Sequence, residues 1–158
     1  MDFPGEEVAD ILIGLGITHV VWLPDSAIGP WEKALDRPGT LELVRVCREG
    51  EAWAIAAGLL LGGRRPLVMI QNTGLFESGD ALRNVLFDLK LPIVAIVGHR
   101  GSLTPGWPDT ARDFAAPVLD AWGIDYRRVA TEEDKPQLAA HLANCLKAER
   151  PGVVLLAE

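Results

Sequence analysis

Residues 93–97 read Ile-Val-Ala-Ile-Val, and residues 153–156 read Val-Val-Leu-Leu. Apolar, β-branched runs of this kind are typical of strands that are covered on both faces, as in a parallel sheet flanked by helices. Similar runs recur along the chain with helical patterns between them, which predicts a doubly wound α/β fold, a three-layer αβα arrangement around a six-stranded parallel sheet. The six predicted strands cover residues 19–23, 41–46, 67–70, 93–97, 126–129 and 153–156.

Glycines mark the ends of two predicted helices. A helix over residues 6–15 stops at Gly16, and a helix over 49–61 stops at Gly62-Gly63, where a left-handed cap favours glycine. A third helix is predicted over residues 75–89, because its apolar residues repeat at alternating spacings of four and three. We interpret that apolar stripe as core packing, with a subunit interface as the alternative.

The composition fits one globular domain over residues 1–158. Hydrophobic residues make up 49% and charged residues 23%, enough apolar surface for a core. The net charge of -7 and the absence of a long basic stripe exclude nucleic acid as a partner. Acidic residues near the N-terminus and the lack of a membrane-length apolar run predict a cytoplasmic protein without a membrane partner.

The cysteines and histidines do not predict a metal site in this chain. Cys47 and Cys145 lie outside any Cys-x-x-Cys or Cys/His pattern, and we expect both to be buried, reduced thiols. The three histidines show no metal-ligand spacing. P-loop, Rossmann and Gly-x-Ser-x-Gly motifs are also absent, which disfavours nucleotide binding and ordinary hydrolase chemistry.

Three predicted strands end in polar or glycine-bearing segments. Residues 23–26 read Leu-Pro-Asp-Ser, residues 71–74 read Gln-Asn-Thr-Gly, and residues 98–101 read Gly-His-Arg-Gly. The carboxyl ends of parallel strands meet at one edge, where open α/β folds place their ligands. The Gly- and Pro-rich stretch 99–112 is predicted to be a loop at that edge.

A further segment places a carboxylate at the start of an Ala-rich helix. Residues 48–58 read Arg-Glu-Gly-Glu-Ala-Trp-Ala-Ile-Ala-Ala-Gly, similar to the Glu-bearing turn and helix in the pyrimidine-binding domain of thiamine-diphosphate enzymes, with Glu49 matching the family's glutamate. Residues 67–75 resemble the Gln-Asn-Ser-Gly-Leu segment of phosphonopyruvate and sulfopyruvate decarboxylases. The segments at 23–26 and 99–101 resemble the family's Val-Pro-Asp-Ser turn and its aromatic-Arg-Gly triplet, so the resemblance spans most of the chain.

The resemblance implies a role for each matching residue around the cofactor. Glu49 would hydrogen-bond the pyrimidine ring and relay its proton, since a carboxyl group can share a proton and apolar neighbours favour its neutral form. Glu51 is a nearby competitor for this role. Asn72 and Thr73 would line the cofactor pocket, and Gly74 would permit close backbone approach. Purely structural roles are the alternatives: Glu49 could cap its helix, and residues 72–74 could form a strand-to-helix turn.

The same resemblance implies substrate contacts at the other two turns. Asp25 and His99 would handle protons or orient a 2-oxoacid, and Ser26 would bind substrate. Arg100 would pair with an anionic group through its two parallel N–H donors. A turn role for Asp25 and for His99, and a surface ion pair for Arg100, are the alternatives.

Two departures from the decarboxylases bear on substrate and cofactor. Residues 76–80 read Phe-Glu-Ser-Gly-Asp, where the family has smaller or amide-bearing residues near the first position, which leaves phosphonate or sulfonate specificity open. The Gly-Asp-Gly motif that holds magnesium and diphosphate in the family is absent. The resemblance therefore implies that a separate β-type diphosphate-binding subunit supplies the Mg²⁺ ligands.

Taken together, the resemblance predicts the α subunit of a sulfopyruvate decarboxylase-like, thiamine-diphosphate-dependent 2-oxoacid decarboxylase. Such a lyase subunit would be active only in a hetero-oligomer, with homo-oligomeric contacts as well. Two alternatives remain. One is a non-catalytic α/β module that binds a small ligand or a partner, because fold does not settle function. The other is a subunit of a carboligating thiamine-dependent enzyme.

Overall fold

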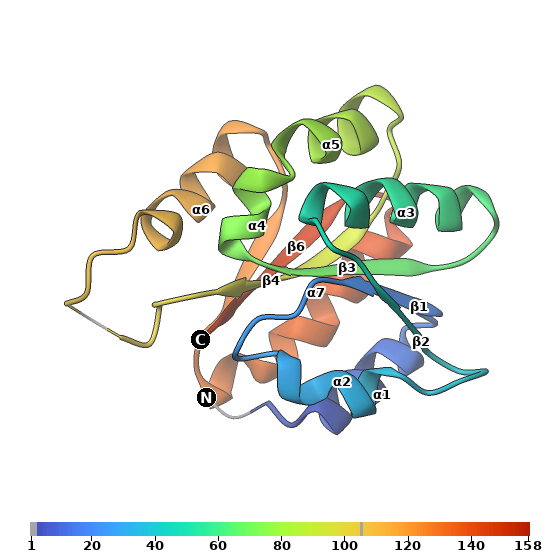
Figure 1. The fold of residues 1–158 in the computed structure, drawn as a ribbon, viewed down its shortest axis with the longest axis horizontal. Helices are drawn as coiled ribbons and strands as arrows, with labels where there is room; N and C mark the ends of the chain where they lie inside the picture. The colour runs from blue at the N-terminus through green and yellow to red at the C-terminus, as the bar shows by residue number, and fades with distance from the viewer. Residues whose placement is uncertain (1–2, 105) are drawn as a thin grey trace.

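A computed structural model describes residues 3–104 and 106–158, and its centre is a sheet of six parallel strands (Figure 1). The strand order is β2-β1-β3-β4-β6-β5. All six predicted strands are confirmed, with ends that shift by one or two residues at most. The strands are β1 His19–Trp22, β2 Glu42–Arg45, β3 Pro66–Gln71, β4 Val94–His99, β5 Tyr126–Val129 and β6 Gly152–Ala157.

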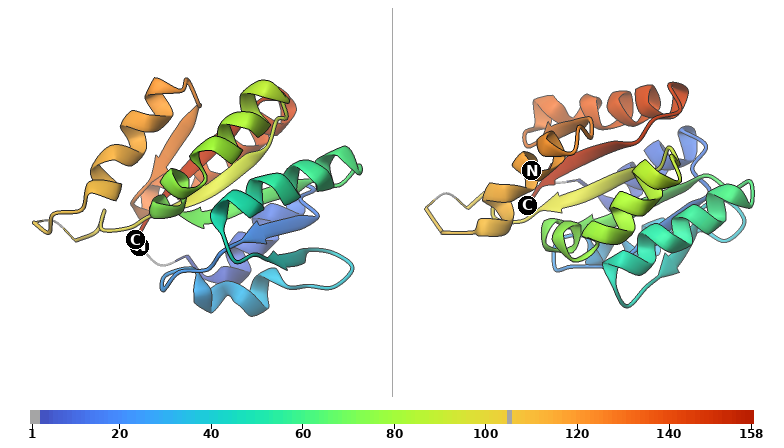
Figure 2. Two further views of the ribbon diagram at one scale, coloured as in Figure 1. Left: turned by 45° about the horizontal axis from the view of Figure 1, so that its top comes forward. Right: turned by 90° about the horizontal axis from the view of Figure 1, so that it is seen from above.

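Helices cover both faces of the sheet, which confirms the predicted three-layer arrangement (Figure 2). One face carries α1 Gly5–Gly14, α2 Glu32–Leu35 and α7 Lys135–Lys147. The other carries α3 Glu49–Leu61, α4 Asn72–Glu77, α5 Gly79–Arg83 and α6 Thr110–Ala121. Short helical turns complete the chain: η1 Gly29–Trp31, the π-helical η2 Asn84–Asp88, and η3 Glu132–Asp134.

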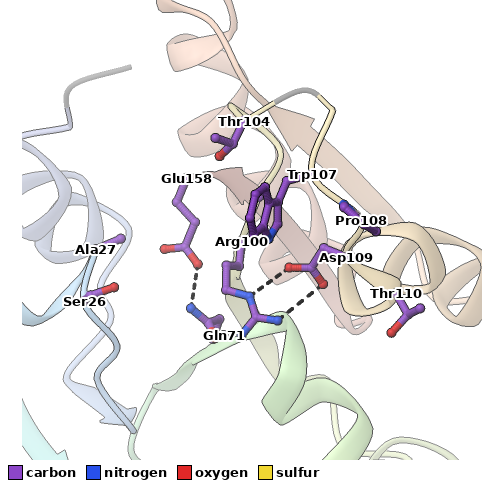
Figure 3. A pocket seen from close by; sticks show the side chains of 11 residues that line it. Ser26, Ala27, Gln71, Arg100, Thr104, Trp107, Pro108, Asp109, Thr110 and Glu158 are labelled. Atoms are coloured by element: carbon purple, nitrogen blue, oxygen red, sulfur yellow. Dashed lines mark hydrogen bonds and ion pairs between the residues drawn. The ribbon is translucent and has the colours of Figure 1, made fainter.

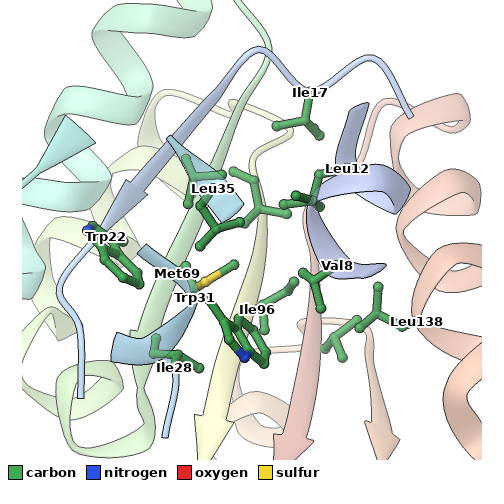
Figure 4. Packing of buried hydrophobic residues seen from close by; sticks show 14 of the residues in the cluster. Val8, Leu12, Ile17, Trp22, Ile28, Trp31, Leu35, Met69, Ile96 and Leu138 are labelled. Atoms are coloured by element: carbon green, nitrogen blue, oxygen red, sulfur yellow. The ribbon is translucent and has the colours of Figure 1, made fainter. Parts of the chain in front are cut away.

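Each face of the sheet has its own apolar core, because successive strand side chains point to opposite sides. In β4, Ile96 packs on the α1 side and Val97 on the α3 side. Figure 4 shows part of the first core, which includes Leu12 of α1, Leu138 of α7, and Met69 and Ile96 of the strands. Fully burying one such side chain stabilises the fold by about 1.5–3 kcal/mol, so these two cores hold the strand ends in place.

The single helix predicted over residues 75–89 is wrong in its bounds. The helical segment begins earlier, at Asn72, and is interrupted at Ser78 before it continues as α5 and η2. The Ser78 hydroxyl donates to the Leu75 carbonyl at 3.3 Å and accepts from the Trp53 indole N–H at 3.1 Å. A side-chain bond to the preceding turn competes with regular helix bonds, which explains the interruption.

The apolar stripe of this segment is buried except at its end. Leu75, Leu82 and Leu86 belong to the second core, as the core interpretation predicts, whereas Leu89 is 55% exposed. Cys47 is also exposed, contrary to expectation, because it lies in the turn that leaves the edge strand β2; only Cys145 is buried.

The loop predicted over residues 99–112 is shorter than expected. His99 is the last residue of β4, and α6 already begins at Thr110. Asp109 starts this helix by accepting the backbone N–H groups of Ala111 and Arg112 at 3.0 and 3.2 Å. The helix therefore supplies one wall of the carboxyl edge of the sheet.

Two further predictions concern caps and membranes. Gly16 and Gly63 adopt φ values of +75° and +77° after α1 and α3, which confirms the left-handed caps. In residues 3–104 and 106–158, we find no helix with the length and apolar character needed to cross a membrane. The single-domain organisation of residues 1–158 and the cytoplasmic location stay predictions.

Candidate functional site

A cavity of about 650 Å³ opens at the carboxyl edge of the sheet (Figure 3). Four of its lining residues follow four different strands: Ser26 after β1, Gln71 at the end of β3, Arg100 after β4 and Glu158 after β6. The predicted convergence of strand ends is therefore present. The remaining lining residues are Ala27 and the loop and helix residues Gly101, Thr104, Trp107, Pro108, Asp109 and Thr110.

Glu158 is the cavity residue that the sequence analysis missed. Its Oε1 accepts from Gln71 Nε2 at 3.0 Å, and Thr73 Oγ1 donates to Gln71 Oε1 at 3.2 Å. Burial raises the pKa of Glu158 to about 7, helped by the negative charge of Asp25 and opposed by Gln71 and Arg100. A polar residue two positions after the predicted strand 153–156 was the signal that could have identified it.

Asp25 lies beside the cavity and forms the turn after β1. Its Oδ1 accepts the backbone N–H groups of Ala27 and Ile28 at 2.7 and 2.9 Å. This is the turn role that the sequence left open as an alternative. Its Oδ2 is buried and has no hydrogen-bond partner among the described residues. Ser26, next in the chain, is exposed and lines the cavity.

Arg100 lines the cavity but already holds a carboxylate. Its Nε and Nη2 donate to the two oxygens of Asp109 at 2.9 and 3.3 Å, as Figure 3 shows. The hydrogen bond from Arg100 lowers the pKa of Asp109, and the same bond raises the pKa of Arg100. An incoming anion therefore has to compete with Asp109 for the guanidinium fork.

His99 does not reach this cavity in the structure. It is 5% exposed, and its Nε2–H donates to the carbonyl oxygen of Arg112 at 3.1 Å. Burial is the main reason that its pKa is lowered. His99 lines a separate cavity of about 400 Å³ with Arg128 and Ala157, among others. The structure thus separates His99 from Ser26 and Arg100.

Glu49 and Gly74 form a close pair at the starts of α3 and α4. A Cβ atom at position 74 would lie 2.3 Å from Glu49 Cγ and 2.6 Å from its Oε1. The Glu49 side chain therefore lies across the Cα of Gly74, and only glycine leaves room for it. This pair is at the same sheet edge, but neither residue lines the 650 Å³ cavity.

The acidic neighbours of Glu49 have structural partners. Glu51 accepts the backbone N–H groups of Cys47 and Arg48 at 3.1 and 3.2 Å, so it caps α3. Glu77 accepts from Gly50 N–H at 2.8 Å and from Arg48 at 2.7 and 3.0 Å. The Gly50 bond, followed by Arg48, lowers the pKa of Glu77. Both backbone bonds of Glu51 thus serve to cap the start of α3.

Asn72 is fully buried at the start of α4, between Gln71 and Thr73. Neither its Nδ2 nor its Oδ1 has a hydrogen-bond partner among the described residues. An unsatisfied buried amide costs about 1–3 kcal/mol per group, so this side chain calls for an explanation. Phe76, the residue that departs from the decarboxylase pattern, is 41% exposed and does not line the cavity.

One group of potential metal ligands lies among the described residues, away from the cavity. The ligand atoms of Asp125, His141 and Cys145 all lie within 4.8 Å of one another. Asp125 also pairs with Arg150, and burial raises the pKa of the Cys145 thiol. Both features oppose metal binding, because a thiolate and a free carboxylate are the species that bind metals.

Decarboxylases are among the known proteins that are similar in sequence to this chain. No protein-family model matches the chain. Phosphonopyruvate decarboxylase of Streptomyces viridochromogenes is 32% identical over 153 residues, which cover 92% of this chain and 38% of that protein. The α subunit of sulfopyruvate decarboxylase from Methanococcus maripaludis is 30% identical over 98 residues, covering 62% of this chain and 59% of that subunit. The chain is thus similar in sequence to parts of these two decarboxylases.

A solved structure shares the fold of this chain. A candidate thiamin diphosphate-dependent enzyme from Mycobacterium smegmatis superposes with a TM-score of 0.70 at 21% identity. The match covers 99% of this chain and 31% of that one. The chain spans less than two thirds of the length of either decarboxylase relative, so it corresponds to one portion of them.

Proposed function

We propose that this chain is the α subunit of a thiamine-diphosphate-dependent 2-oxoacid decarboxylase, active only with a separate diphosphate-binding β subunit. The proposal rests above all on the Glu49–Gly74 pair, in which a partly exposed carboxylate lies across a glycine at the start of two helices. The homology to sulfopyruvate and phosphonopyruvate decarboxylases supports the reaction class.

The residues around this pair fit a pyrimidine ring. Glu49 makes no hydrogen bond to another described residue, whereas Glu51 and Glu77 are both occupied. Glu49 is therefore the carboxylate that can hydrogen-bond a ring nitrogen and hold a proton there. The unpartnered amide of Asn72 and the Thr73 hydroxyl would form the adjoining wall. Thiamine diphosphate, when bound, supplies the electron sink for the carbanion that decarboxylation leaves.

The 650 Å³ cavity would hold the 2-oxoacid. Ser26 can donate a hydrogen bond, and Arg100 can bind a carboxylate through its fork if Asp109 is displaced. The burial of His99 in a separate cavity argues against its direct contact with substrate. We assign it instead to positioning α6, through its bond to the Arg112 carbonyl.

A partner subunit would complete the site. The chain contains no Gly-Asp-Gly motif, so the Mg²⁺ and diphosphate ligands would come from a β-type subunit. Relatives from Methanococcus maripaludis and Methanocaldococcus jannaschii are named as α subunits, which supports a hetero-oligomer. Copies of this chain would also contact one another in the assembly.

The test mixes the chain with thiamine diphosphate, Mg²⁺ and a β-type subunit that carries Gly-Asp-Gly. Release of carbon dioxide is measured with sulfopyruvate, phosphonopyruvate and pyruvate. Glu49→Gln should lower turnover by at least about a hundredfold, the range of general acid–base contributions. Glu149→Gln makes the same charge change beyond α7, far from the carboxyl edge, and should leave turnover unchanged.

Two outcomes would count against the proposal. Wild-type turnover in Glu49→Gln would show that the carboxylate is not the proton relay. Absence of carbon dioxide release with every 2-oxoacid, in the presence of a folded complex, would favour the non-catalytic module, and formation of a new carbon–carbon bond without net release would favour carboligation.

A further inference from the structure

Two carboxylates from opposite parts of the sequence converge beside the cavity, and each has one oxygen without a partner. Asp25 enters after β1, and its Oδ2 is buried and unpaired among the described residues. Glu158 enters after β6, and its Oε2 is likewise buried and unpaired. In Figure 3 one Glu158 oxygen points to Gln71 and the other toward the segment of Ser26 and Ala27.

The two carboxylates differ in what stabilises their charge. Asp25 Oδ1 accepts two backbone N–H bonds, at 2.7 and 2.9 Å. Glu158 has only the neutral amide of Gln71, at 3.0 Å. Burial and the nearby charge of Asp25 both disfavour a charged carboxylate at position 158, so Glu158 keeps its proton more readily than an ordinary glutamate.

The other charged groups around Glu158 do not remove this effect. Arg100 attracts a negative charge, but its fork is occupied by Asp109 from the same loop. The side chain of His99 lies in the other cavity, although its backbone carbonyl accepts from Glu158 N–H at 3.5 Å. Besides burial, which is the largest cause, Asp25 raises the pKa of Glu158, and Gln71 and Arg100 lower it.

We propose that Glu158 is a protonated binding residue, whose carboxyl O–H donates a hydrogen bond to a carboxylate or carbonyl oxygen of the 2-oxoacid in the cavity. This inference rests on the proposed function, because it takes the cavity as the 2-oxoacid site. Glu158 lines that cavity together with Arg100 and Ser26. A neutral donor suits an anionic ligand here, since the positive charge of Arg100 is already balanced by Asp109.

Protonation and anion binding should therefore be coupled. Below about pH 7 the neutral carboxyl of Glu158 donates a hydrogen bond through its O–H, and above about pH 7 its ionised carboxylate repels the anion. The pKa of Glu158 is about 7, so its protonated fraction falls roughly tenfold between pH 6 and pH 8. We expect the affinity for pyruvate, which stays ionised over this range, to fall by about the same factor.

The experiment measures pyruvate binding to the full chain by calorimetry or NMR at pH 6 and pH 8. Glu158→Gln keeps an N–H donor but cannot titrate, so its affinity should be similar at both pH values. Glu158→Ala should bind weakly at both. Asp25→Asn removes the neighbouring charge and should move the midpoint of the wild-type profile to lower values, which a purely structural Glu158 would not require.

A direct readout keeps the inference separate from the proposed function. The ¹³C carboxyl signal of Glu158 should titrate near pH 7 and be missing in Glu158→Gln. Titration at the ordinary glutamate value, about 4.3, or equal wild-type affinity at both pH values would overturn the inference. If pyruvate binds with this pH dependence but no complex releases carbon dioxide, the proposed function fails and the protonated binding residue stands.

Discussion

The contact between Glu49 and Gly74 makes a sharp prediction for Gly74→Ala. The added methyl would lie 2.3 Å from Glu49 Cγ and 2.8 Å from its Cδ. Ordinary carbon contacts are about 3.5–4.0 Å, so the Glu49 side chain has to move by roughly 1 Å or more. It can do so, because it is partly exposed and makes no hydrogen bond to another described residue.

The stability of the variant should change little while its activity falls. Gly74 lies within α4, where alanine gains up to about 1 kcal/mol over glycine. Overpacking costs about 1–3 kcal/mol when neighbours are rigid, and Glu49 is not. We therefore expect a net change within about 1–2 kcal/mol. A misplacement of about 1 Å in a reacting group can cost on the order of a hundredfold in rate.

The assay compares urea unfolding of the chain with carbon dioxide release by the complex. Gly14→Ala is the matched control, because no heavy atom lies within 4 Å of the added methyl and Gly14 is helical. Turnover of Gly74→Ala equal to that of the wild type would refute the importance of the Glu49 position. Destabilisation well above 3 kcal/mol would refute the view that Glu49 yields to the methyl.

Three other measurements test contacts that the site depends on. Ser78→Ala should cost about 1–3 kcal/mol of unfolding free energy, because it leaves the buried indole N–H of Trp53 without its acceptor. Asp109→Ala should lower the free energy of unfolding through the lost α6 cap, yet strengthen pyruvate binding by releasing Arg100. The difference in stability between the wild type and Asp109→Ala should disappear in acid. The lowered pKa of Asp109 means that its ionised form stabilises the fold above about pH 4, and this contribution is lost as the pH falls below that value. Glu158 should show the opposite dependence of stability on pH, because its pKa is raised to about 7. As the pH rises from 5 to 8, the wild type should lose stability relative to Glu158→Gln in urea titrations.

Sequence patterns predicted the sheet well because burial on both faces leaves a direct trace in composition. The central runs 93–97 and 153–156 are both completely buried. Even the edge strand β5 was recognised, although two exposed arginines, Arg127 and Arg128, form its centre. Glycine caps were equally readable, since a left-handed φ at Gly16 or Gly63 leaves few alternatives.

The features that sequence reasoning missed depend on side-chain hydrogen bonds. The helix break at Ser78 requires the Trp53 indole, which is 25 residues away in the chain. The early start of α6 depends on Asp109, a residue equally common in turns and caps. Glu158 was overlooked because its significance comes from Asp25 and Gln71, contributed by distant strands.

Residues 71–74, at the end of β3 and the start of α4, connect the proposed 2-oxoacid cavity with the Glu49–Gly74 pair. Gln71 reaches Glu158 in the cavity, while Thr73 donates back to Gln71 from the helix that carries Gly74. A shift of α4 that moves Gly74 against Glu49 would therefore also move the donor that fixes Gln71. Coupling through this chain of hydrogen bonds predicts that Thr73→Val, which keeps the shape but removes the donor, perturbs the Glu158 titration without touching either carboxylate. An unchanged ¹³C titration of Glu158 in Thr73→Val would show instead that the two sites are independent.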